Sequence, residues 1–452
     1  MRRNRFRSKS EVSIATCFAV ILGSLGPVIL GPIVATSAAE QKIGAPPEAM
    51  NMRLVGCNDL QGRSAYQPTV HRQGNRYIAY IDHHGGTPEV PKPLDPLTGQ
   101  LEFNGTSIVD VTDPAHPQYL AHIPDDVTDP AKPTLIWQRD GELNDTHKSF
   151  WECDSGIAYL VSGVPGWRVN RMTEVYDMSD PAHPVKIRDF GLPGQQPGAS
   201  GPIPEQLHGM ISLGAHGNRI YFGYGTNKNG IMQIVDRDKL IHGPKEPTPE
   251  NLLYPEVGRL VMTPFNGAHT TFPMPKMPIA EFAKDTVGAE RDMVMIVDEQ
   301  IRNACEEPRQ MAWFVDVTIE AHPMVISNFQ VPEASGDFCS RGGRFGTHAS
   351  NESMAPIFYK KIVFLSYFNA GVRAVDVRDP YHPKEVGYFI PAITATTDKR
   401  CVKANGQDSC KVAIQTNNVE TDDRGYIYIV DRTNTGMHIL ELTGEASAVA
   451  TH

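Results

Sequence analysis

The sequence lacks the short motifs by which the commoner enzyme classes are recognised. It contains no Gly-x-Ser-x-Gly elbow, no Walker phosphate loop, no Gly-x-Gly-x-x-Gly dinucleotide fingerprint and no His-Glu-x-x-His motif. These absences exclude the usual hydrolase, kinase and nicotinamide-dependent enzymes. Any catalytic chemistry must therefore come from another arrangement of residues.

An excess of basic charge is also lacking. The 42 Lys and Arg residues against 52 Asp and Glu give a formal net charge of −10, which becomes −14 without the basic N-terminal segment described below. Nucleic-acid binding needs a clustered cationic surface to contact phosphates. The composition therefore predicts that the chain has no nucleic-acid partner.

A long hydrophobic run occurs at the N-terminus, from about residue 12 to residue 34, behind five basic residues. The small residues at 36–39 that follow it suit a signal peptidase. We interpret residues 1–39 as a secretory signal peptide and residues 40–452 as the mature domain, which is expected to be periplasmic or secreted. Retention of the run as a membrane anchor is the alternative, and its glycines and prolines disfavour it. No other membrane contact is expected.

Cysteine is scarce, and no Cys-x-x-Cys pair is present. Six cysteines remain in the mature part, and an even number in an exported chain predicts three disulfides. Cys401 and Cys410 bracket a polar loop and are expected to pair. Elimination then leaves two further pairs, Cys305 with Cys339 and Cys57 with Cys153. A thiolate metal cluster is not expected outside the cytoplasm.

Long helical stretches are few, whereas one phrase recurs along the chain. Residues 108–117 read Ile-Val-Asp-Val-Thr-Asp-Pro-Ala-His-Pro, and close copies occupy 175–184, 314–323 and 374–383. Shorter copies lie at 234–238 and 439–442. Repeats of this length indicate stacked units, none of which can bury its own apolar face.

The pattern inside each unit predicts four short strands, which is the content of a propeller blade. In the third unit the expected strands are 210–213, 219–224, 231–236 and 257–262. We therefore predict an all-β fold, a single β-propeller of six blades. The last unit has room for three strands, so residues 52–56 are expected to supply its fourth strand and close the ring. Seven blades are the alternative, because the insertion between Phe272 and Met293 is long enough to hold further strands.

The Val-Asp phrase resembles the repeat of the LVIVD-repeat β-propellers. The resemblance covers nearly all of the mature chain. It implies the propeller fold and leaves the activity open.

Two sets of four histidines recur with the repeat. The first set lies in Asp-Pro-x-His-Pro or a variant of it, where Pro restricts φ and Asp caps a turn: His116, His183, His322 and His382. A geometric role in a turn accounts for these histidines.

The second set falls at the predicted start of four successive innermost strands: His147, His208, His269 and His348, which are 61, 61 and 79 residues apart. Inner strands crowd around a propeller axis, so we expect these imidazoles to converge there on a metal ion. A set of imidazoles without thiolate or carboxylate favours Fe(II) or Cu over Zn. The alternative is that the histidines fill the channel through hydrogen bonds alone.

These axial histidines are similar to those of two groups of propeller enzymes. In the carotenoid cleavage oxygenases four axial histidines hold Fe(II), and the group of selenium-binding proteins and methanethiol oxidases has a histidine-bound metal. The similarity implies a metal centre, but it does not extend to their substrates.

The two blades without such a histidine carry Gln67 and Asn417-Asn418 at the corresponding position. We assign Gln67 and Asn417 to substrate or water beside an open coordination position, with hydrogen bonding between inner strands as the alternative. Four carboxylates near strand starts are candidates to orient the imidazoles: Asp145, Glu205, Glu352 and Glu420. Glu352 is the one that we add to the catalytic set.

Together these features predict an exported, metal-dependent oxidoreductase that uses O2. A small, largely apolar substrate is expected from the residues that follow two of the histidines: Phe150, Trp151, Phe272 and Met274. Packing between blades is the alternative role of these side chains. Two other classes remain open. One is a non-enzymatic propeller that binds a protein or glycan, and the other is a metal-dependent lyase or hydrolase.

Overall fold

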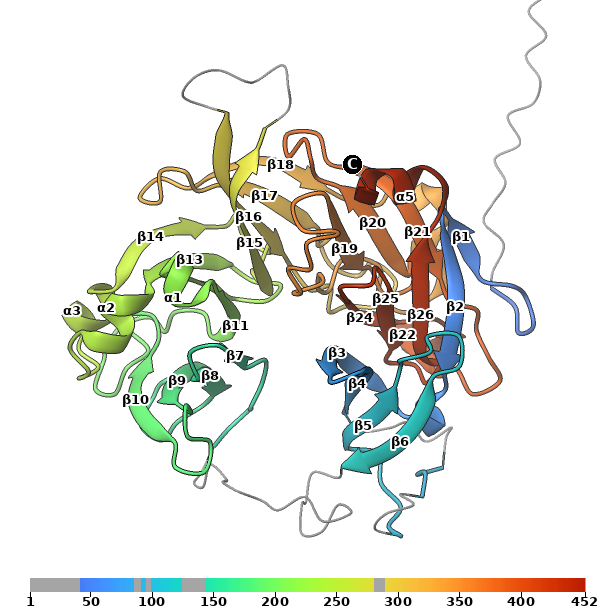
Figure 1. Ribbon diagram of the computed structural model, residues 1–452, viewed down its shortest axis with the longest axis horizontal. Helices are drawn as coiled ribbons and strands as arrows, with labels where there is room; N and C mark the ends of the chain where they lie inside the picture. The colour runs from blue at the N-terminus through green and yellow to red at the C-terminus, as the bar shows by residue number, and fades with distance from the viewer. Residues whose placement is uncertain (1–40, 85–90, 95–98, 124–142, 280–288, 452) are drawn as a thin grey trace, which may run out of the picture. The chain divides into compact units, whose positions relative to one another are not determined.

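The computed structural model describes residues 41–84, 91–94, 99–123, 143–279 and 289–451. The expected signal peptide, residues 1–39, lies outside the described residues. The described chain forms six four-stranded antiparallel sheets around one axis, with β3, β7, β11, β15 and β24 innermost in five of them (Figure 1). The predicted six-bladed β-propeller is confirmed. None of the helices within these ranges has the length and hydropathy needed to cross a membrane.

Blades 1 to 3 each contain four consecutive strands. Blade 1 consists of β3 (Ala65–Gln73), β4 (Arg76–His83), β5 (Gly105–Asp110) and β6 (Gln118–Ile123). Blade 2 consists of β7 (Phe150–Trp151), β8 (Ile157–Ser162), β9 (Met172–Asp177) and β10 (Val185–Phe190). Blade 3 consists of β11 (Leu207–Ser212), β12 (Arg219–Tyr224), β13 (Ile231–Asp236) and β14 (Glu256–Val261).

Blade 4 contains the insertion because of which seven blades were the alternative prediction. It consists of β15 (Thr270–Pro278), β16 (Glu290–Val297), β17 (Ala312–Asp316) and β18 (Met324–Phe329). The insertion lengthens the β15–β16 hairpin, in which Pro278 still pairs with Glu290. The tip of the hairpin, residues 280–288, lies outside the described residues.

Blades 5 and 6 take strands from both ends of the chain. Blade 5 contains β19 (Ile362–Ser366), β20 (Val372–Asp376), β21 (Lys384–Ile390) and β1 (Glu48–Met50). Blade 6 contains β24 (Thr416–Thr421), β25 (Ile427–Asp431), β26 (Gly436–Leu442) and β2 (Met52–Asn58). A separate hairpin connects the two blades, formed by β22 (Lys399–Ala404) and β23 (Gln407–Val412).

The N-terminal strand β2 closes the ring as predicted. It pairs with β26, with Met52 opposite Leu442 and Asn58 opposite Met437. The preceding strand β1 pairs with β21 of blade 5, so one short segment covers the exposed edges of two neighbouring blades. Ring closure therefore depends on residues 379 to 390 positions apart in the chain.

The helices are short and lie outside the sheets. They are η1 (Leu60–Gly62), α1 (Gly214–Gly217), α2 (Arg237–His242), α3 (Pro249–Leu253), η3 (Glu333–Ser335), α4 (Phe338–Arg341) and α5 (Gly444–Thr451).

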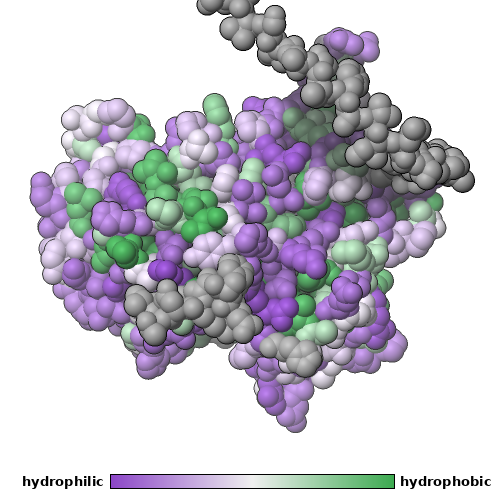
Figure 2. Space-filling view, turned by 90° about the horizontal axis from the view of Figure 1, so that it is seen from above, coloured by the Kyte–Doolittle hydropathy of each residue, from purple (hydrophilic) through white to green (hydrophobic). Residues whose placement is uncertain are grey.

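The core lies between neighbouring blades rather than within one sheet. Five apolar clusters join blades 2 and 3, 3 and 4, 4 and 5, 5 and 6, and 6 and 1. Large side chains such as Phe222, Phe314 and Phe364 are fully buried there, and each contributes about 1.5–3 kcal/mol by leaving water. On the face shown in Figure 2, hydrophilic residues predominate and apolar residues form small groups among them.

The histidines of the Asp-Pro-x-His-Pro phrase lie in exposed turns, as expected. The Nδ1 atom of His183 is 2.9 Å from Asp180 Oδ2, and the equivalent distance from His116 to Asp113 is also 2.9 Å. Each imidazole therefore closes its own turn against the Asp three residues earlier.

Two of the three expected disulfides are present, Cys305–Cys339 and Cys401–Cys410. The third prediction is wrong, since Cys57 and Cys153 are both free and exposed. Cys57 lies on the outer strand of blade 6 and Cys153 follows the inner strand of blade 2, with blade 1 between these blades. A disulfide needs Cα atoms about 4.4–6.8 Å apart, which elimination along the sequence does not test.

Candidate metal centre on the propeller axis

The four axial histidines lie where the inner strands of blades 2 to 5 begin. His208 is the second residue of β11, and His269 directly precedes β15. In blades 2, 4 and 5 the backbone N–H of the histidine donates to a carbonyl of the next strand outward: His147 to Val161 of β8 at 3.0 Å, His269 to Val297 of β16 at 2.9 Å, and His348 to Ser366 of β19 at 3.0 Å. In blade 5 the short segment that begins at His348 therefore lies inside β19. The common position in each blade brings all four imidazoles to the same end of the axis.

The imidazole rings form a continuous group. Successive ring centroids are 4.5 Å apart for His147 and His208, 3.5 Å for His208 and His269, and 4.5 Å for His269 and His348. The Nε2 atoms of His147 and His208 are 2.8 Å apart. Residues separated by as many as 201 positions thus present ring nitrogens to one small volume.

Backbone carbonyls determine the tautomers of two of these rings. His208 Nδ1 lies 2.9 Å from the carbonyl oxygen of His269, and His348 Nδ1 lies 2.6 Å from that of Asn417. A carbonyl only accepts hydrogen bonds, so each Nδ1 carries the proton and each Nε2 keeps its lone pair. Metal-ligating histidines are held in this way.

Three of the four imidazoles are buried. Burial lowers the pKa of His208, His269 and His348 well below the usual value for histidine, so these rings are neutral at physiological pH. Neutral imidazole is the form that binds metal ions. His147 is the exposed member of the group.

Glu299 is a member of the group that the sequence analysis missed. A carboxylate oxygen of Glu299 and ring nitrogens of His208 and His269 all lie within 4.8 Å of one another, close enough for one metal ion. The Oε1 atom of Glu299 is also 3.6 Å from His348 Nε2. The residues present therefore offer imidazole and carboxylate ligands together.

The turn before Glu299 ties it to the start of the neighbouring inner strand. The buried carboxylate of Asp298 accepts hydrogen bonds from the backbone N–H groups of Gly267, Asn227 and Glu299. Gly267 has no room for a Cβ atom, which would meet the carbonyl oxygen of Gly225. These hydrogen bonds thus hold together the loops that carry Glu299 and His269.

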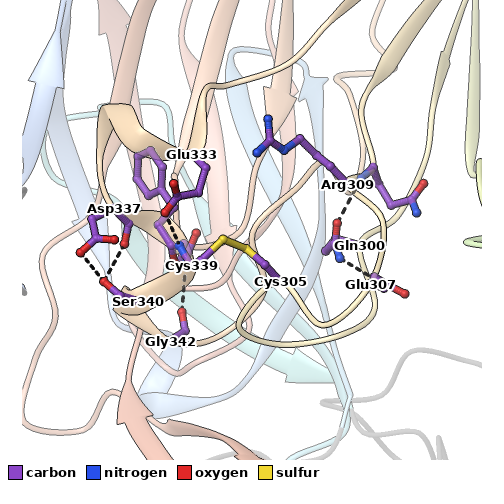
Figure 3. Close-up of a disulfide and its surroundings, with 12 residues drawn as sticks. Gln300, Cys305, Glu307, Arg309, Glu333, Asp337, Cys339, Ser340 and Gly342 are labelled. Atoms are coloured by element: carbon purple, nitrogen blue, oxygen red, sulfur yellow. Dashed lines mark hydrogen bonds between the residues drawn. A yellow bond between two sulfur atoms is a disulfide. The ribbon is translucent and has the colours of Figure 1, made fainter.

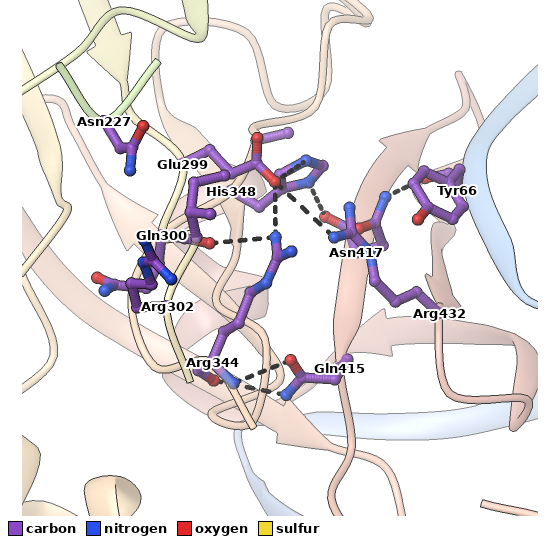
Figure 4. A network of polar contacts seen from close by, with 12 residues as sticks. Tyr66, Asn227, Glu299, Gln300, Arg302, Arg344, His348, Gln415, Asn417 and Arg432 are labelled. Carbon is purple, nitrogen blue, oxygen red and sulfur yellow. Dashed lines mark hydrogen bonds and ion pairs between the residues drawn. The ribbon is translucent and has the colours of Figure 1, made fainter. Parts of the chain in front are cut away.

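Two arginines share the carboxylate of Glu299 (Figure 4). Arg344 Nη1 lies 2.8 Å from Glu299 Oε1, and Arg432 Nη1 lies 3.8 Å from the same atom. Desolvation lowers the pKa of Arg432 to about 10, so this buried guanidinium stays charged at neutral pH. These two arginines and Glu299 together therefore carry more positive than negative charge next to the imidazoles.

The disulfide Cys305–Cys339 braces the two loops that lead to this network (Figure 3). Cys305 follows the turn of Glu299, and Cys339 lies in α4, shortly before Arg344 and His348. The crosslink therefore limits how far the carboxylate and the last histidine can separate.

Replacing Cys305 and Cys339 by serine is expected to lower the free energy of unfolding by about 3–4 kcal/mol. The open chain regains the freedom of a loop with a sequence separation of 34 residues. The double serine variant of Cys401 and Cys410, whose separation is 9 residues, should lose about 1 kcal/mol less. Chemical denaturation of both variants measures this difference, and equal losses would contradict the role given to loop length.

Gln67 and Asn417 lie side by side on the inner strands of blades 1 and 6. Asn418 Nδ2 donates to Gln67 Oε1, and Asn417 Nδ2 donates to the carbonyl oxygen of Tyr66 at 2.8 Å. These bonds join the two inner strands, which was the alternative role. The Oδ1 atom of Asn417 is buried and has no hydrogen-bond partner among the described residues, so it can still accept a bond from a ligand.

Glu352 belongs to a second polar group. Its carboxylate forms an ion pair with Lys148, whose Nζ also donates to Thr270 Oγ1 at 3.1 Å. That hydroxyl oxygen is 3.0 Å from His269 Nδ1, so the group supports the imidazole indirectly. Glu420 accepts the backbone N–H groups of Glu352 and Ser353.

The other expected neighbours of the histidines have separate surroundings. Asp145 pairs with Arg171 at 2.8 Å, and Glu205 lies beside Gly225. Phe272 and Met274 are buried in the cluster between blades 4 and 5, and Phe150 packs against it. Trp151 is exposed. The structure thus gives Phe272 and Met274 a packing role, and these four side chains do not form a common apolar wall beside the histidines.

Comparison with known proteins yields similarity at the level of three-dimensional structure alone. No protein-family model and no curated protein matches the sequence. The WD40 domain of Toxoplasma gondii coronin has a TM-score of 0.36 and 9% identity over 89% of this chain and 87% of that one. The K499G mutant of NanB sialidase from Streptococcus pneumoniae has a TM-score of 0.33 and 10% identity over 87% and 70% of the two chains. At these values neither protein bears on the function.

Proposed function

We propose that this chain is an exported, metal-dependent oxidoreductase that uses O2, with its metal held by the axial histidines and Glu299. One observation carries the proposal. His208 and His348 have their Nδ1 protons fixed by backbone carbonyls, which turns the Nε2 lone pairs toward the group that contains His269 and Glu299. Histidines that only filled the channel through hydrogen bonds would not need to direct their unprotonated Nε2 atoms toward one group.

The donor set favours Fe(II). Imidazoles without a carboxylate suit Fe(II) and Cu equally, whereas histidines combined with one carboxylate are typical of non-haem Fe(II) oxygenases. Cu is the next candidate, and Zn is less favoured. When bound, such a metal supplies the one-electron chemistry with O2 that amino-acid side chains lack.

The protein residues would have distinct tasks around that metal. His208, His269 and Glu299 are buried or nearly so and would hold it, while exposed His147 lies on the side open to substrate. Asn417 offers an unpartnered acceptor beside His348, suited to orienting a substrate or water. The two disulfides support export, because such bonds persist in oxidising compartments.

A non-enzymatic propeller that binds a protein or glycan would need no such convergence. In that case the four imidazoles are expected to lie apart, whereas the successive ring centroids are 3.5–4.5 Å apart. A metal-dependent lyase or hydrolase would use the same ligands and differ only in its consumption of O2.

The test is metal analysis of the purified mature protein, followed by chelation and anaerobic reloading with Fe(II), Cu or Zn. We expect one metal ion per chain and O2 uptake that depends on Fe(II) or Cu in the presence of a substrate. A protein that binds none of the three metals would overturn the proposal. A loaded protein that turns over its substrate without consuming O2 would be a lyase or hydrolase.

A further inference from the structure

The guanidinium of Arg432 lacks the partners that a buried cation normally has. Arg432 is 8% exposed, and no described residue accepts a hydrogen bond from its side chain. Its Nε atom is buried without a partner, and its one ionic neighbour is Glu299 at 3.8 Å. Buried polar groups are almost always hydrogen-bonded, so the N–H donors of this side chain are available to bind a ligand.

Aromatic rings hold this guanidinium in place. Its central carbon lies 4.4 Å from the centre of the Tyr66 ring and 5.3 Å from that of Phe368. Arg344 also lies over Phe368, at 5.2 Å. The two arginines are thus oriented by the same ring, and Phe368 in turn lies 5.2 Å from His348 of the metal group.

The charges around these arginines do not balance. Arg344 and Arg432 carry two positive charges, and Glu299 supplies one negative charge to both. Arg400 and Arg171 have their own partners, Asp398 and Asp145. Within the ion pairs of these two guanidiniums one positive charge remains, and a metal ion on the histidines would add to it.

We propose that the substrate of this centre carries a carboxylate, which Arg432 and Arg344 bind beside the metal. A guanidinium presents paired N–H donors that match the two oxygens of a carboxylate. A monoanion also matches the single unbalanced charge. The aromatic rings next to the arginines would contact the organic part of the same molecule.

This inference rests on the proposed function for the position of the metal, but the anion site can be tested separately. Titration calorimetry with benzoate and its neutral analogue benzamide, on the mature protein before and after chelation, provides the test. We expect benzoate to bind both forms at least tenfold more tightly than benzamide. Arg432→Gln should weaken benzoate binding at least tenfold, and Arg432→Lys should weaken it less.

The control is Arg219→Gln, which removes a guanidinium paired with Glu320, in blade 3 and away from the axial group. It should bind benzoate as the unmodified protein does. Equal binding of benzoate and benzamide, or benzoate binding that is unaffected by Arg432→Gln, would overturn the carboxylate site. If benzoate binds through Arg432 in a protein that takes up no metal, the proposed function fails and the anion site stands.

Discussion

Substituting His208 by alanine is expected to lower the affinity for metal by more than tenfold and to abolish the metal-dependent activity. His208 lies in the middle of the group, since its ring contacts those of both His147 and His269. Loss of a residue that merely orients a ligand already costs about 10–100-fold in metal affinity or activity, so loss of a ligand should cost at least as much. Metal content after dialysis, measured by mass spectrometry, gives the result.

The control for this variant is a histidine of the other repeated set. His183→Ala removes an exposed imidazole that closes a turn against Asp180, in the blade next to His208. It should keep the full metal content. Among the axial residues, His269→Ala should match His208→Ala, and exposed His147→Ala should lose less. If His208→Ala keeps its metal, or His183→Ala loses as much, the axial group is not the metal centre.

The repeat made most of the fold predictable before the structure. The Val-Asp phrase marks the third strand of blades 1 to 4, as in β5 and β9, and it marks β20 in blade 5. The axial histidines precede the phrase at the start of the same unit. In a propeller, inner-strand residues at the same position of successive repeats lie close together around the axis. Strand β2 was predictable for a related reason, because the last unit had three strands and an open edge.

Glu299 was not predictable from the repeat, because it does not lie at the start of an inner strand, where the axial histidines recur. It comes two residues after Val297, the last residue of β16, which pairs with Thr270 beside His269. Arg432 likewise follows Asp431, which ends β25 and pairs with Thr416 at the start of β24. In an antiparallel hairpin the end of the second strand returns to the start of the first. Charged residues just after the second strand were therefore a signal of residues on the axis.

The pairing of Cys57 with Cys153 failed for a different reason, and Phe272 and Met274 have the packing role that was their alternative. Pairing by elimination assumed that every cysteine has a partner, whereas the fold separates Cys57 and Cys153 by an entire blade. Phe272 and Met274 follow His269 along β15, but alternate strand residues face the neighbouring blade, where both are buried. Adjacency in sequence to a ligand does not place a side chain in the same pocket.

Glu299→Gln is expected to reduce metal affinity at least tenfold while the shape of the side chain is preserved. The substitution removes the carboxylate that lies with His208 and His269. It also leaves Arg344 and Arg432 without a counter-charge, which should lower the free energy of unfolding by about 3 kcal/mol. Loss of metal and loss of stability are therefore both expected, and they have to be separated.

Two further variants separate them. Glu352→Gln removes another carboxylate near the axis, which is 17% exposed against 12% for Glu299 and is paired with Lys148 but lies outside the ligand group. It should lose stability and keep its metal. The double variant Glu299→Gln, Arg344→Gln should regain part of the lost stability, because one unpaired cation is gone, and still fail to hold metal. Recovery of metal binding in this double variant would show that Glu299 acts through its ion pairs and is not a ligand.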